Sequence, residues 1–348
     1  MIKEAIGKIV ERENLSEKEA RKVMDEIMEG KATPAQIGSF LTALRMKGET
    51  GEEISGFVKS MMDKVVSFSV SHRFLADTCG TGGDGKKTFN VSTCTAFVVA
   101  GAGVPVAKHG NRALSSSCGS ADVLEALGAR IDLPPEGVRE CIEETGFGFL
   151  FAPLFHPAMK YALGPRREMG IRTVFNILGP IANPLSASIR ILGVFHPHLL
   201  ELLPRALISL GVKRAYLVYG EEGLDEVSLG GKTEVLQIKE GRKKRFSVFP
   251  EDFGIRRRTG EKLIRGGSPE RNARILRSVL EGEKGPFRDM VLLNSSLCLM
   301  AAGKAKDFRE GVKVAQESID SGRAKEKLEH FVKFTQGWKN YAGEDKRV

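Results

Sequence analysis

The stretch Asp77-Thr78-Cys79-Gly80-Thr81-Gly82-Gly83-Asp84-Gly85 decides how the rest of the chain is interpreted. Its four glycines lack a Cβ atom, so the backbone can adopt positive φ angles and turn its N–H groups toward an anion. A short apolar run at 74–76 enters the stretch like a strand, and Asn90 or Ser92 can cap a helix that continues through residues 96–100. Because a helix N-terminus attracts negative charge, the pattern predicts a phosphate-binding loop between a strand and a helix.

Two better-known glycine motifs are excluded. The spacing Gly80-x-Gly82-x-x-Gly85 satisfies the dinucleotide-binding pattern, but that pattern needs an acidic residue roughly 20 positions later, and the region around Lys108 offers no carboxylate. The spacing also resembles a Walker A loop, yet Lys87 stands where a Ser or Thr must hold magnesium. A plain glycine-rich turn is the remaining alternative, and the helix start that follows disfavours it.

Composition places the chain among ordinary globular proteins. Charged residues make up 28% of the 348 residues and hydrophobic ones 41%. No apolar run approaches a membrane span, and the first residues form an amphipathic helix pattern rather than a signal peptide. The five cysteines contain no Cys-x-x-Cys pair, which argues against a disulfide framework and a structural zinc site. We therefore expect a cytoplasmic protein with no membrane partner.

The formal net charge of +9 is compatible with nucleic acid, an anionic membrane or a polyanionic small substrate. Basic residues are scattered along the chain, with local clusters only at 242–245 and 256–258. A solvated basic surface explains this pattern, and no nucleic-acid partner is expected.

Local signals make the first 66 residues helical. Residues 2–13 have a 3.6-residue period, and capping boxes at 16–19 and 50–53 each begin a further helix. Between them, Thr33-Pro34 begins a helix that ends at Gly48. On this helix, Phe40, Leu41 and Leu44 add apolar surface beyond what so small a bundle needs. We expect the 34–47 face to form a dimer contact, with burial inside the subunit as the alternative.

From residue 74 onward, short apolar runs alternate with helical patterns. The runs expected to be strands are 104–107, 148–151, 189–195 and 215–219, and helices are expected at 121–127, 135–145 and 198–210. Alternating strands and helices imply a largely parallel sheet that binds ligands at the carboxyl ends of its strands. Residues 234–239 and 245–249 predict a hairpin on that sheet, and residues 269–336 return to helix.

Three further segments carry chemistry. Lys108-His109-Gly110-Asn111-Arg112 follows a predicted strand and precedes a Ser/Gly-rich helix start, which predicts a second anion-binding surface. Asp225-Glu226 follows another strand, and magnesium is usually held by one or two carboxylates plus substrate phosphates. Arg166-Arg167 offers a guanidinium that can bind a carboxylate. The structural alternatives are a basic loop, a solvated acidic turn and an ion pair of an arginine with Glu168.

Together these motifs resemble the anthranilate phosphoribosyltransferase family. The matching segments, in the family's order and spacing, are 80–85, 90–93, 108–112, 119–122, 172–176, 178–180 and 224–226. The resemblance covers essentially the whole chain. It implies a small all-helical domain joined by hinges to a larger α/β domain with a central, mostly parallel sheet, a fold like that of nucleoside phosphorylases and phosphoribosyltransferases. Residues 1–68, joined by part of 160–184, would form the helical domain, and residues 69–348 the α/β domain.

The resemblance also implies an activity: transfer of phosphoribose from 5-phosphoribosyl 1-diphosphate to the amine of anthranilate, releasing diphosphate, in tryptophan biosynthesis. Magnesium, expected as two ions, would be the cofactor, and the enzyme would be a homodimer formed through the helical domain. The expected ligands of the phosphoribosyl substrate are Gly80, Gly83, Asp84, Thr88, Asn90, Val91, Ser92, Thr93, Lys108, His109, Gly110, Asn111, Arg112, Ala113, Leu114, Ser115, Ser116 and Ser120. Ser92, Asp225 and Glu226 would hold the metal. Gly80, His109, Asn111 and Arg166 would face anthranilate, with Arg167 a lesser candidate and His109 a late proton acceptor.

Two rival functions remain at this point. A pyrimidine nucleoside phosphorylase of similar fold runs a related ribosyl transfer with inorganic phosphate, although the 108–112 segment and the Asp225-Glu226 pair resemble the transferase instead. A paralogue that kept the fold and binds nucleic acid through its basic surface would show salt-sensitive DNA affinity. The set Asn111 and Arg166, suited to a carboxylate, argues against this second alternative.

Overall fold

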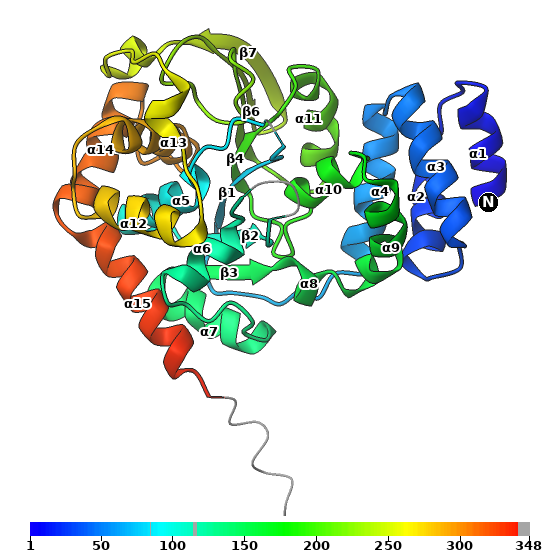
Figure 1. Cartoon of the computed structure of the whole chain (residues 1–348), viewed down its shortest axis with the longest axis horizontal. Coiled ribbons are helices and arrows are strands. Elements are labelled where there is room, and N and C mark those ends of the chain that lie inside the picture. The colour runs from blue at the N-terminus through cyan, green and yellow to red at the C-terminus, as the bar shows by residue number, and fades with distance from the viewer. Residues whose placement is uncertain (84, 114–116, 340–348) are drawn as a thin grey trace, which may run out of the picture.

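The computed structural model describes residues 1–83, 85–113 and 117–339, and Figure 1 shows their arrangement. A small group of N-terminal helices packs beside a larger α/β part whose sheet runs through the middle of the molecule. The predicted fold class is therefore confirmed. In the described residues, no helix combines the length and the apolar character that a membrane span needs.

The N-terminal helices begin at the residues that the sequence predicts. They are α1 (Ile2–Val10), α2 (Glu17–Met28), α3 (Pro34–Lys47) and α4 (Gly51–Asp63). Ser16, Thr33 and Thr50 each cap a helix with a complete capping box, and Pro34 occupies the first turn of α3. Gly48, at a φ of 88°, ends α3 with a backbone conformation that favours glycine.

Phe40, Leu41 and Leu44 do not form the expected dimer contact, because they take the alternative, burial inside the subunit. All three are at most 1% exposed within the subunit, and Phe40 packs edge-on against Phe57 of α4. The bundle is not closed by its own four helices. Instead it shares one core with α9 (Lys160–Met169), α10 (Phe175–Ile181) and α11 (Leu199–Ser209), which follow much later in the chain. These later helices account for the apolar surface that a four-helix bundle did not need.

A seven-stranded sheet forms the centre of the α/β part. Its strands are β1 (Ala76–Gly80), β2 (Val106–Gly110), β3 (Phe147–Phe151), β4 (Ile189–Gly193), β5 (Arg214–Gly220), β6 (Thr233–Lys239) and β7 (Arg242–Val248), in the order β3-β2-β1-β4-β5-β6-β7. The first five strands in this order are parallel, and β6 and β7 add the predicted hairpin in antiparallel fashion. Because the five parallel strands point the same way, their carboxyl ends lie along one edge of the sheet.

Two strands begin later than the sequence pattern suggests. The strand predicted at 74–76 runs from Ala76 into Gly80, so it contains the start of the glycine-rich stretch. The strand predicted at 104–107 begins only after Pro105, because proline has no N–H for the ladder. It then runs on through Lys108 and His109, which pair with Phe149 and Leu150 of β3. The two basic residues are therefore fixed on a strand rather than carried on a loop.

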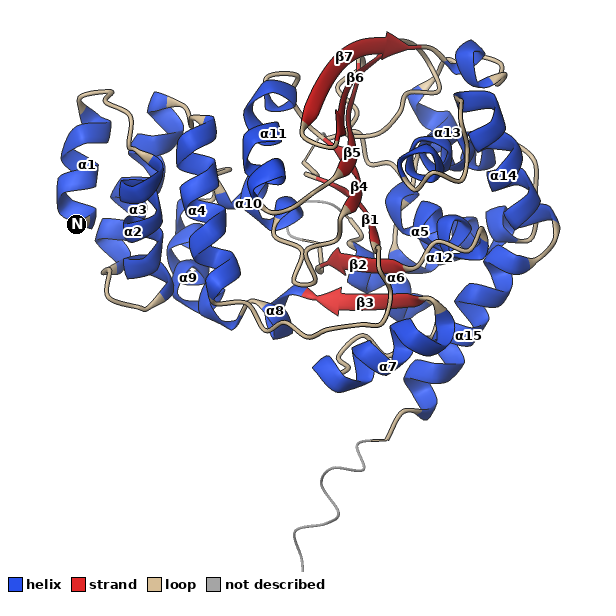
Figure 2. Ribbon diagram, turned by 180° about the vertical axis from the view of Figure 1, so that it is seen from behind, coloured by secondary structure: helices blue, strands red, loops and turns tan. Residues whose placement is uncertain are grey.

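Helices cover both faces of the sheet, as Figure 2 shows from behind. On one side lie α5 (Val91–Gly101), α12 (Pro269–Leu280), α13 (Pro286–Ala301), α14 (Phe308–Asp320) and α15 (Arg323–Gly337), which share a core with β1–β3. On the other side, α10 and α11 separate the sheet from the N-terminal helices. Short helices complete the chain: α6 (Ser120–Ala126), α7 (Pro135–Thr145) and α8 (Ala152–Phe155).

Candidate active site

The glycine-rich loop lies directly on the acidic turn that follows β5. Gly82 donates its backbone N–H to Asp225 Oδ2 at 2.7 Å, across 143 residues of sequence. Gly82, Gly83 and Gly85 have φ angles of 66°, 73° and 74°, the positive values that the composition of the loop predicts. The loop and one predicted metal-binding carboxylate therefore form a single site.

At two other positions, glycine is needed because another residue approaches the backbone closely, not because the φ angle is positive. A Cβ atom on Gly80 would collide with the Asp225 carboxylate, and one on Gly193 would collide with the Asp225 backbone carbonyl. Asp225 is thus pressed against the ends of β1 and β4, where it is 8% exposed. The sequence suggests positive φ at every glycine of the loop, whereas Gly80 serves to admit this carboxylate.

Lys108 and Ser92 connect β2 to the start of α5. The Lys108 ammonium is 1% exposed and donates to the Thr78 carbonyl at 2.6 Å and to Ser92 Oγ at 3.3 Å. Burial lowers the pKa of Lys108, while the nearby Asp77 and Glu226 carboxylates oppose the shift by favouring the charged form. Glu226 therefore lies close enough to Lys108 to act on its charge. Lys108 therefore supports the site by linking β1 to the start of α5.

A buried ion pair supports the same strands. Arg190 on β4 donates to the Asp77 carboxylate at 2.8 Å, and both side chains are at most 1% exposed. Asn183 donates to the same carboxylate at 2.9 Å, and the backbone N–H of His109 does so at 3.3 Å. Arg190 also donates to the backbone carbonyls of Pro180 and Ile181 at the end of α10. The network thus fixes the position of His109 relative to the end of α10.

His109 is buried and neutral. Burial lowers the pKa of its imidazole well below 6.5, and the neighbouring His156 and Arg190 act in the same direction, while a hydrogen bond to the Gly179 backbone opposes them. Its Nε2 atom has no hydrogen-bond partner in the described part of the chain. In the neutral tautomer that carries its proton on Nδ1, Nε2 has a free lone pair. The ring centroids of His109 and His156 lie 5.0 Å apart.

Asn90 occupies the N-cap position of α5, but its side chain does not cap the helix. It accepts a hydrogen bond from Asn272 of α12 at 2.9 Å and donates to the Cys118 carbonyl at 3.2 Å. The Ser/Gly-rich segment is thereby tied to the helix start. Ser120, the first residue of α6, donates to the Asn111 carbonyl at 3.4 Å and lies against Gly110. These residues, predicted as one anion-binding surface, do come together.

Arg112 points elsewhere. Its guanidinium is paired with Glu125, and with Asp122 at 3.3 Å, both on α6, and its side chain is 50% exposed. Asn111 is exposed, and its Oδ1 accepts from the Arg112 backbone N–H at 2.7 Å. In this conformation the two side chains are engaged within their own loop.

Arg166 and Arg167 differ sharply in environment. Arg166, in the last turn of α9, is half-buried, and its guanidinium lies 5.1 Å from the ring centroid of Phe175 on α10. Burial lowers the pKa of Arg166, but an arginine stays charged at neutral pH. No carboxylate pairs with it in the part of the chain that the structure describes. Arg167 is exposed, so Arg166 is the better candidate for an enclosed anion.

Several predicted ligands turn no polar side chain toward the site or lie outside the described residues. Val91 and Thr93 are buried on α5, and their N–H groups donate to the Phe89 and Asn90 carbonyls at 2.7 and 3.1 Å. Gly110 has no side chain, and the Ala113 N–H donates to Asp122 at 2.9 Å. Asp84 and the run Leu114, Ser115 and Ser116 lie outside the described residues.

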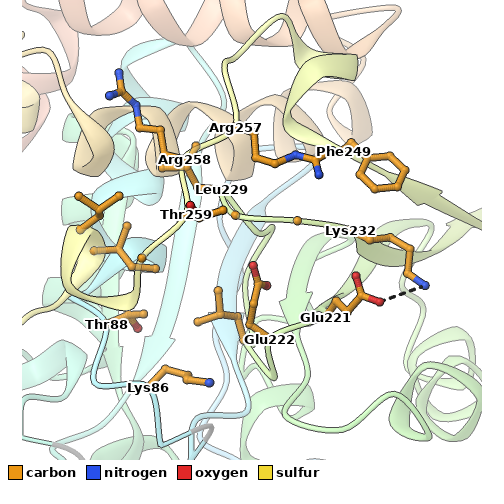
Figure 3. Close-up of a pocket in the computed structure, with 16 residues that line it drawn as sticks. Lys86, Thr88, Glu221, Glu222, Leu229, Lys232, Phe249, Arg257, Arg258 and Thr259 are labelled. Carbon is orange, nitrogen blue, oxygen red and sulfur yellow. Dashed lines mark ion pairs between the residues drawn. The ribbon is translucent and has the colours of Figure 1, made fainter.

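A cavity of about 460 Å³ opens beside the glycine-rich loop, as Figure 3 shows. Its wall includes Lys86 and Thr88, the residues that continue the loop, together with Glu222 and Leu224 from the turn that carries Asp225. Ser92, Lys108 and Asp225 do not line it. Thr88, predicted as a phosphate ligand, therefore faces a cavity beside the cluster of Ser92, Lys108 and Asp225 and not the cluster itself.

Sequence reasoning gave no role to four residues that the structure places at the site. Asp77, Asn183 and Arg190 form the buried support of His109, and Arg172 contacts the glycine-rich loop through Gly83. Arg172 lies in the 172–176 motif, which marks the segment but does not show what the guanidinium reaches. The buried network left no local signal, because its members come from three separate segments.

The donor set fits magnesium. Asp225 and Glu226 supply carboxylates and Ser92 a hydroxyl, and magnesium keeps several waters and substrate phosphates instead of requiring a full protein cage. Among the described residues, no group of three or more His, Cys, Asp or Glu side chains suited to a metal occurs. A magnesium ion bound here would take its remaining ligands from water and substrate phosphates.

Comparisons with known proteins define the class and then the family. Residues 3–65 match the helical bundle domain of a glycosyl transferase family, and residues 72–325 match the α/β domain of that family. The chain is 52% identical to the anthranilate phosphoribosyltransferase of Acetivibrio thermocellus, covering 98% of this chain and 99% of the relative. The chain belongs to the anthranilate phosphoribosyltransferase family.

Solved structures agree. The anthranilate phosphoribosyltransferase of Thermus thermophilus superposes with a TM-score of 0.90 at 45% identity, covering 96% of this chain and 99% of that one. The enzyme of Saccharomyces cerevisiae, solved in complex with PRPP and Mg, gives a TM-score of 0.90 at 31% identity, with coverage of 97% and 98%. These matches favour the transferase over the nucleoside phosphorylase and the nucleic-acid-binding paralogue.

Proposed function

We propose that this protein transfers the phosphoribosyl group of 5-phosphoribosyl 1-diphosphate (PRPP) to the amine of anthranilate, giving N-(5-phosphoribosyl)anthranilate and diphosphate. This is a step of tryptophan biosynthesis. The observation that carries the proposal is the bond between Gly82 N–H and the Asp225 carboxylate, because it joins an anion-binding loop to a metal-binding turn. A diphosphate with bound magnesium needs both.

The phosphates would lie at the carboxyl edge of the parallel strands. The loop offers backbone N–H groups, and α5, which begins directly behind it, presents its N-terminus to the same space. Asn90, Ser92 and Ser120 add polar side chains that are already held by neighbours. Lys108 would contribute a positive charge next to Ser92, although its burial disfavours the charged form.

Asp225, Glu226 and Ser92 would hold magnesium, and we propose two ions, one for each carboxylate. When bound, the metal supplies charge neutralisation for the departing diphosphate. The protein would orient the metal through Asp225. This carboxylate is held by the hydrogen bond from Gly82 and by close packing against Gly80 and Gly193. A metal ligand held in this way needs little reorganisation during the reaction.

Anthranilate would lie between α9, α10 and β2. Arg166 presents a half-buried charge suited to the carboxylate, and α10 links it to His109 through Phe175 and the Gly179 carbonyl. Asn111 would contribute from the end of β2. Gly80, predicted as a further anthranilate contact, would offer only its backbone, because Asp225 fills the space where a Cβ would lie.

The chemistry requires little acid or base. The aromatic amine of anthranilate is neutral at pH 7, so its lone pair is free to attack as diphosphate leaves. Positive charge then develops on the ribose and negative charge on the diphosphate, and aligned reactants with compensating charges lower the barrier. His109 Nε2, with its lone pair, suits the late acceptance of the amine proton.

We also propose the assembly. Residues 1–68, with part of 160–184, form the helical domain, and residues 69–348 form the α/β domain; the packing of α9 on α2 and α3 supports this division. Exposed apolar side chains remain on the helical part at Val10 and Met46, which are 62% and 74% exposed. A second copy of this chain would cover them. The five cysteines are all free, which is consistent with a cytoplasmic enzyme.

Substrate use separates this function from its rivals. The purified protein should consume anthranilate only when PRPP and magnesium are present, and it should not phosphorolyse thymidine. Phosphorolysis of thymidine without consumption of anthranilate would favour the nucleoside phosphorylase.

A further inference from the structure

We propose that Arg172 is an additional phosphate-binding residue, which contacts the diphosphate of PRPP at the glycine-rich loop. The proposal rests on the function proposed above and goes beyond the predicted site residues, none of which is Arg172. It assigns a ligand, the diphosphate, to a cation on the segment between α9 and α10.

The position of the guanidinium is the first argument. It covers one face of Gly83, since a Cβ atom built on that glycine would lie 2.5 Å from Arg172 Nη2. Gly83 has a φ of 73°, a conformation that side chains rarely adopt, so the guanidinium lies on bare backbone. The loop thus contacts Asp225 through Gly82 and Arg172 through Gly83.

The support of the side chain is the second argument. The Arg172 guanidinium carbon lies 5.0 Å from the ring centroid of Phe195, a favourable cation–π arrangement. The backbone N–H of Phe195 donates to Thr81 Oγ1 at 3.0 Å, and the Thr81 N–H donates to the Gly193 carbonyl at 2.9 Å. The residue that supports Arg172 is therefore bonded to the loop that Arg172 covers. The cation, its support and the loop form one unit.

Its charge is the third argument. Arg172 is exposed, and no carboxylate of the described residues forms an ion pair with it. An arginine fork binds phosphate oxygens in bidentate fashion. A diphosphate in the loop would therefore meet Arg172 from the side of the helical part.

This role predicts a specific pattern. Arg172→Met keeps much of the apolar stem and removes the charge. The KM for PRPP should rise by about tenfold or more, and kcat should fall because charge grows on the leaving diphosphate. The KM for anthranilate should stay within about twofold of its wild-type value. Arg172→Lys keeps the charge without the planar fork, so its KM for PRPP and its kcat should lie between those of the wild type and those of Arg172→Met.

Titration with inorganic diphosphate and magnesium, followed by calorimetry, gives a second readout that does not require turnover. Arg172→Met should bind diphosphate more weakly, while Arg139→Met, at an exposed position on α7, should bind it like the wild type. If the methionine variant does not fold, Arg172→Gln repeats both measurements.

A defect confined to anthranilate, or wild-type values in both measurements, would overturn the assignment. The outcomes also separate the two proposals. If the wild type binds diphosphate through Arg172 but transfers no phosphoribose to anthranilate, the proposed function fails and the role of Arg172 stands.

Discussion

The backbone N–H of Gly82 and the carboxylate of Asp225 are hydrogen-bonded at 2.7 Å. The two residues follow β1 and β5, which flank β4 in the sheet, so their strand ends lie two positions apart at the same edge. The bond closes the space above β4, where Gly193 has no side chain to occupy it. Phosphate recognition and metal binding thus meet at one point of the fold.

Replacing both acidic residues, Asp225→Asn with Glu226→Gln, should weaken magnesium binding and lower kcat by at least about tenfold. The amide oxygen introduced by Asp225→Asn can still accept the bond from Gly82, so the loop should keep its position. The measurement is initial rate against magnesium concentration. Glu221→Gln, an exposed carboxylate just after β5, is the matched control and should behave like the wild type. A double variant with an unchanged magnesium dependence would refute the metal assignment.

Arg166→Ala should act on anthranilate alone. Losing one charge-assisted contact costs about 1.5–3 kcal/mol, which is roughly a ten- to hundredfold increase in KM. The KM for PRPP should change little, and Asn111→Ala should show the same selectivity more weakly. Each substrate is titrated at saturation of the other. A defect mainly in PRPP would place Arg166 at the phosphates, and a larger effect of Arg167→Ala would transfer the role to its neighbour.

Much of this fold could be predicted from the sequence. Capping boxes located the helices that begin after Ser16 and Thr50, and Thr33-Pro34 located the helix between them, because each signal lies within a few consecutive residues. Alternating strands and helices indicated the parallel sheet and the edge at which the site lies. The loop, the 108–112 segment and Asp225-Glu226 were recognised because the sequence places each at or shortly after the end of a predicted strand.

What could not be predicted depends on contacts between distant segments. The burial of Phe40, Leu41 and Leu44 requires α9, α10 and α11, which begin more than a hundred residues later. Local hydrophobicity shows that these side chains need a partner but not which one. Likewise, the glycines at 80 and 193 are explained only by the approach of Asp225, and the support of His109 by Asp77 and Arg190 joins separate strands.

Acidification should destabilise the protein through its buried histidines. Burial lowers the pKa of His156 to about 4, against 6.5 for the free side chain. Between these values the unfolded chain binds a proton that the folded chain does not, so stability decreases as pH falls from about 6.5 toward 4. His109, shifted in the same direction, adds to the effect.

Urea unfolding at pH 7 and pH 5 measures this loss. His156→Gln removes the titrating group and keeps a donor for the Ala182 carbonyl, which His156 bonds at 2.9 Å. Between pH 7 and pH 5, the free energy of unfolding of the wild type should fall by about 2 kcal/mol more than that of this variant. His198→Gln, at an exposed site, should retain the wild-type pH dependence. Equal losses in the wild type and His156→Gln would show that His156 is not buried in its neutral form.

The proposed dimer contact makes a hydrodynamic prediction. Val10 and Met46 lie on α1 and α3, two helices that pack together. Lys47 at the end of α3 donates to Asn14, in the loop between α1 and α2, at 2.8 Å. Charges at both positions, Val10→Glu with Met46→Glu, should give monomers by sedimentation velocity with an unchanged fold, because a desolvated charge opposes burial. Phe74→Glu, on the α/β part, should leave the dimer intact. A wild type that already sediments as a monomer would refute the contact.

The most direct test follows the fluorescence of anthranilate as it is consumed by the purified protein with PRPP and magnesium at pH 7. We expect the fluorescence to fall, to stay constant when PRPP is omitted or magnesium is chelated, and to fall at least about tenfold more slowly with the Asp225→Asn, Glu226→Gln double variant. Constant fluorescence with the complete mixture, or a loss that is insensitive to chelation, would contradict the account.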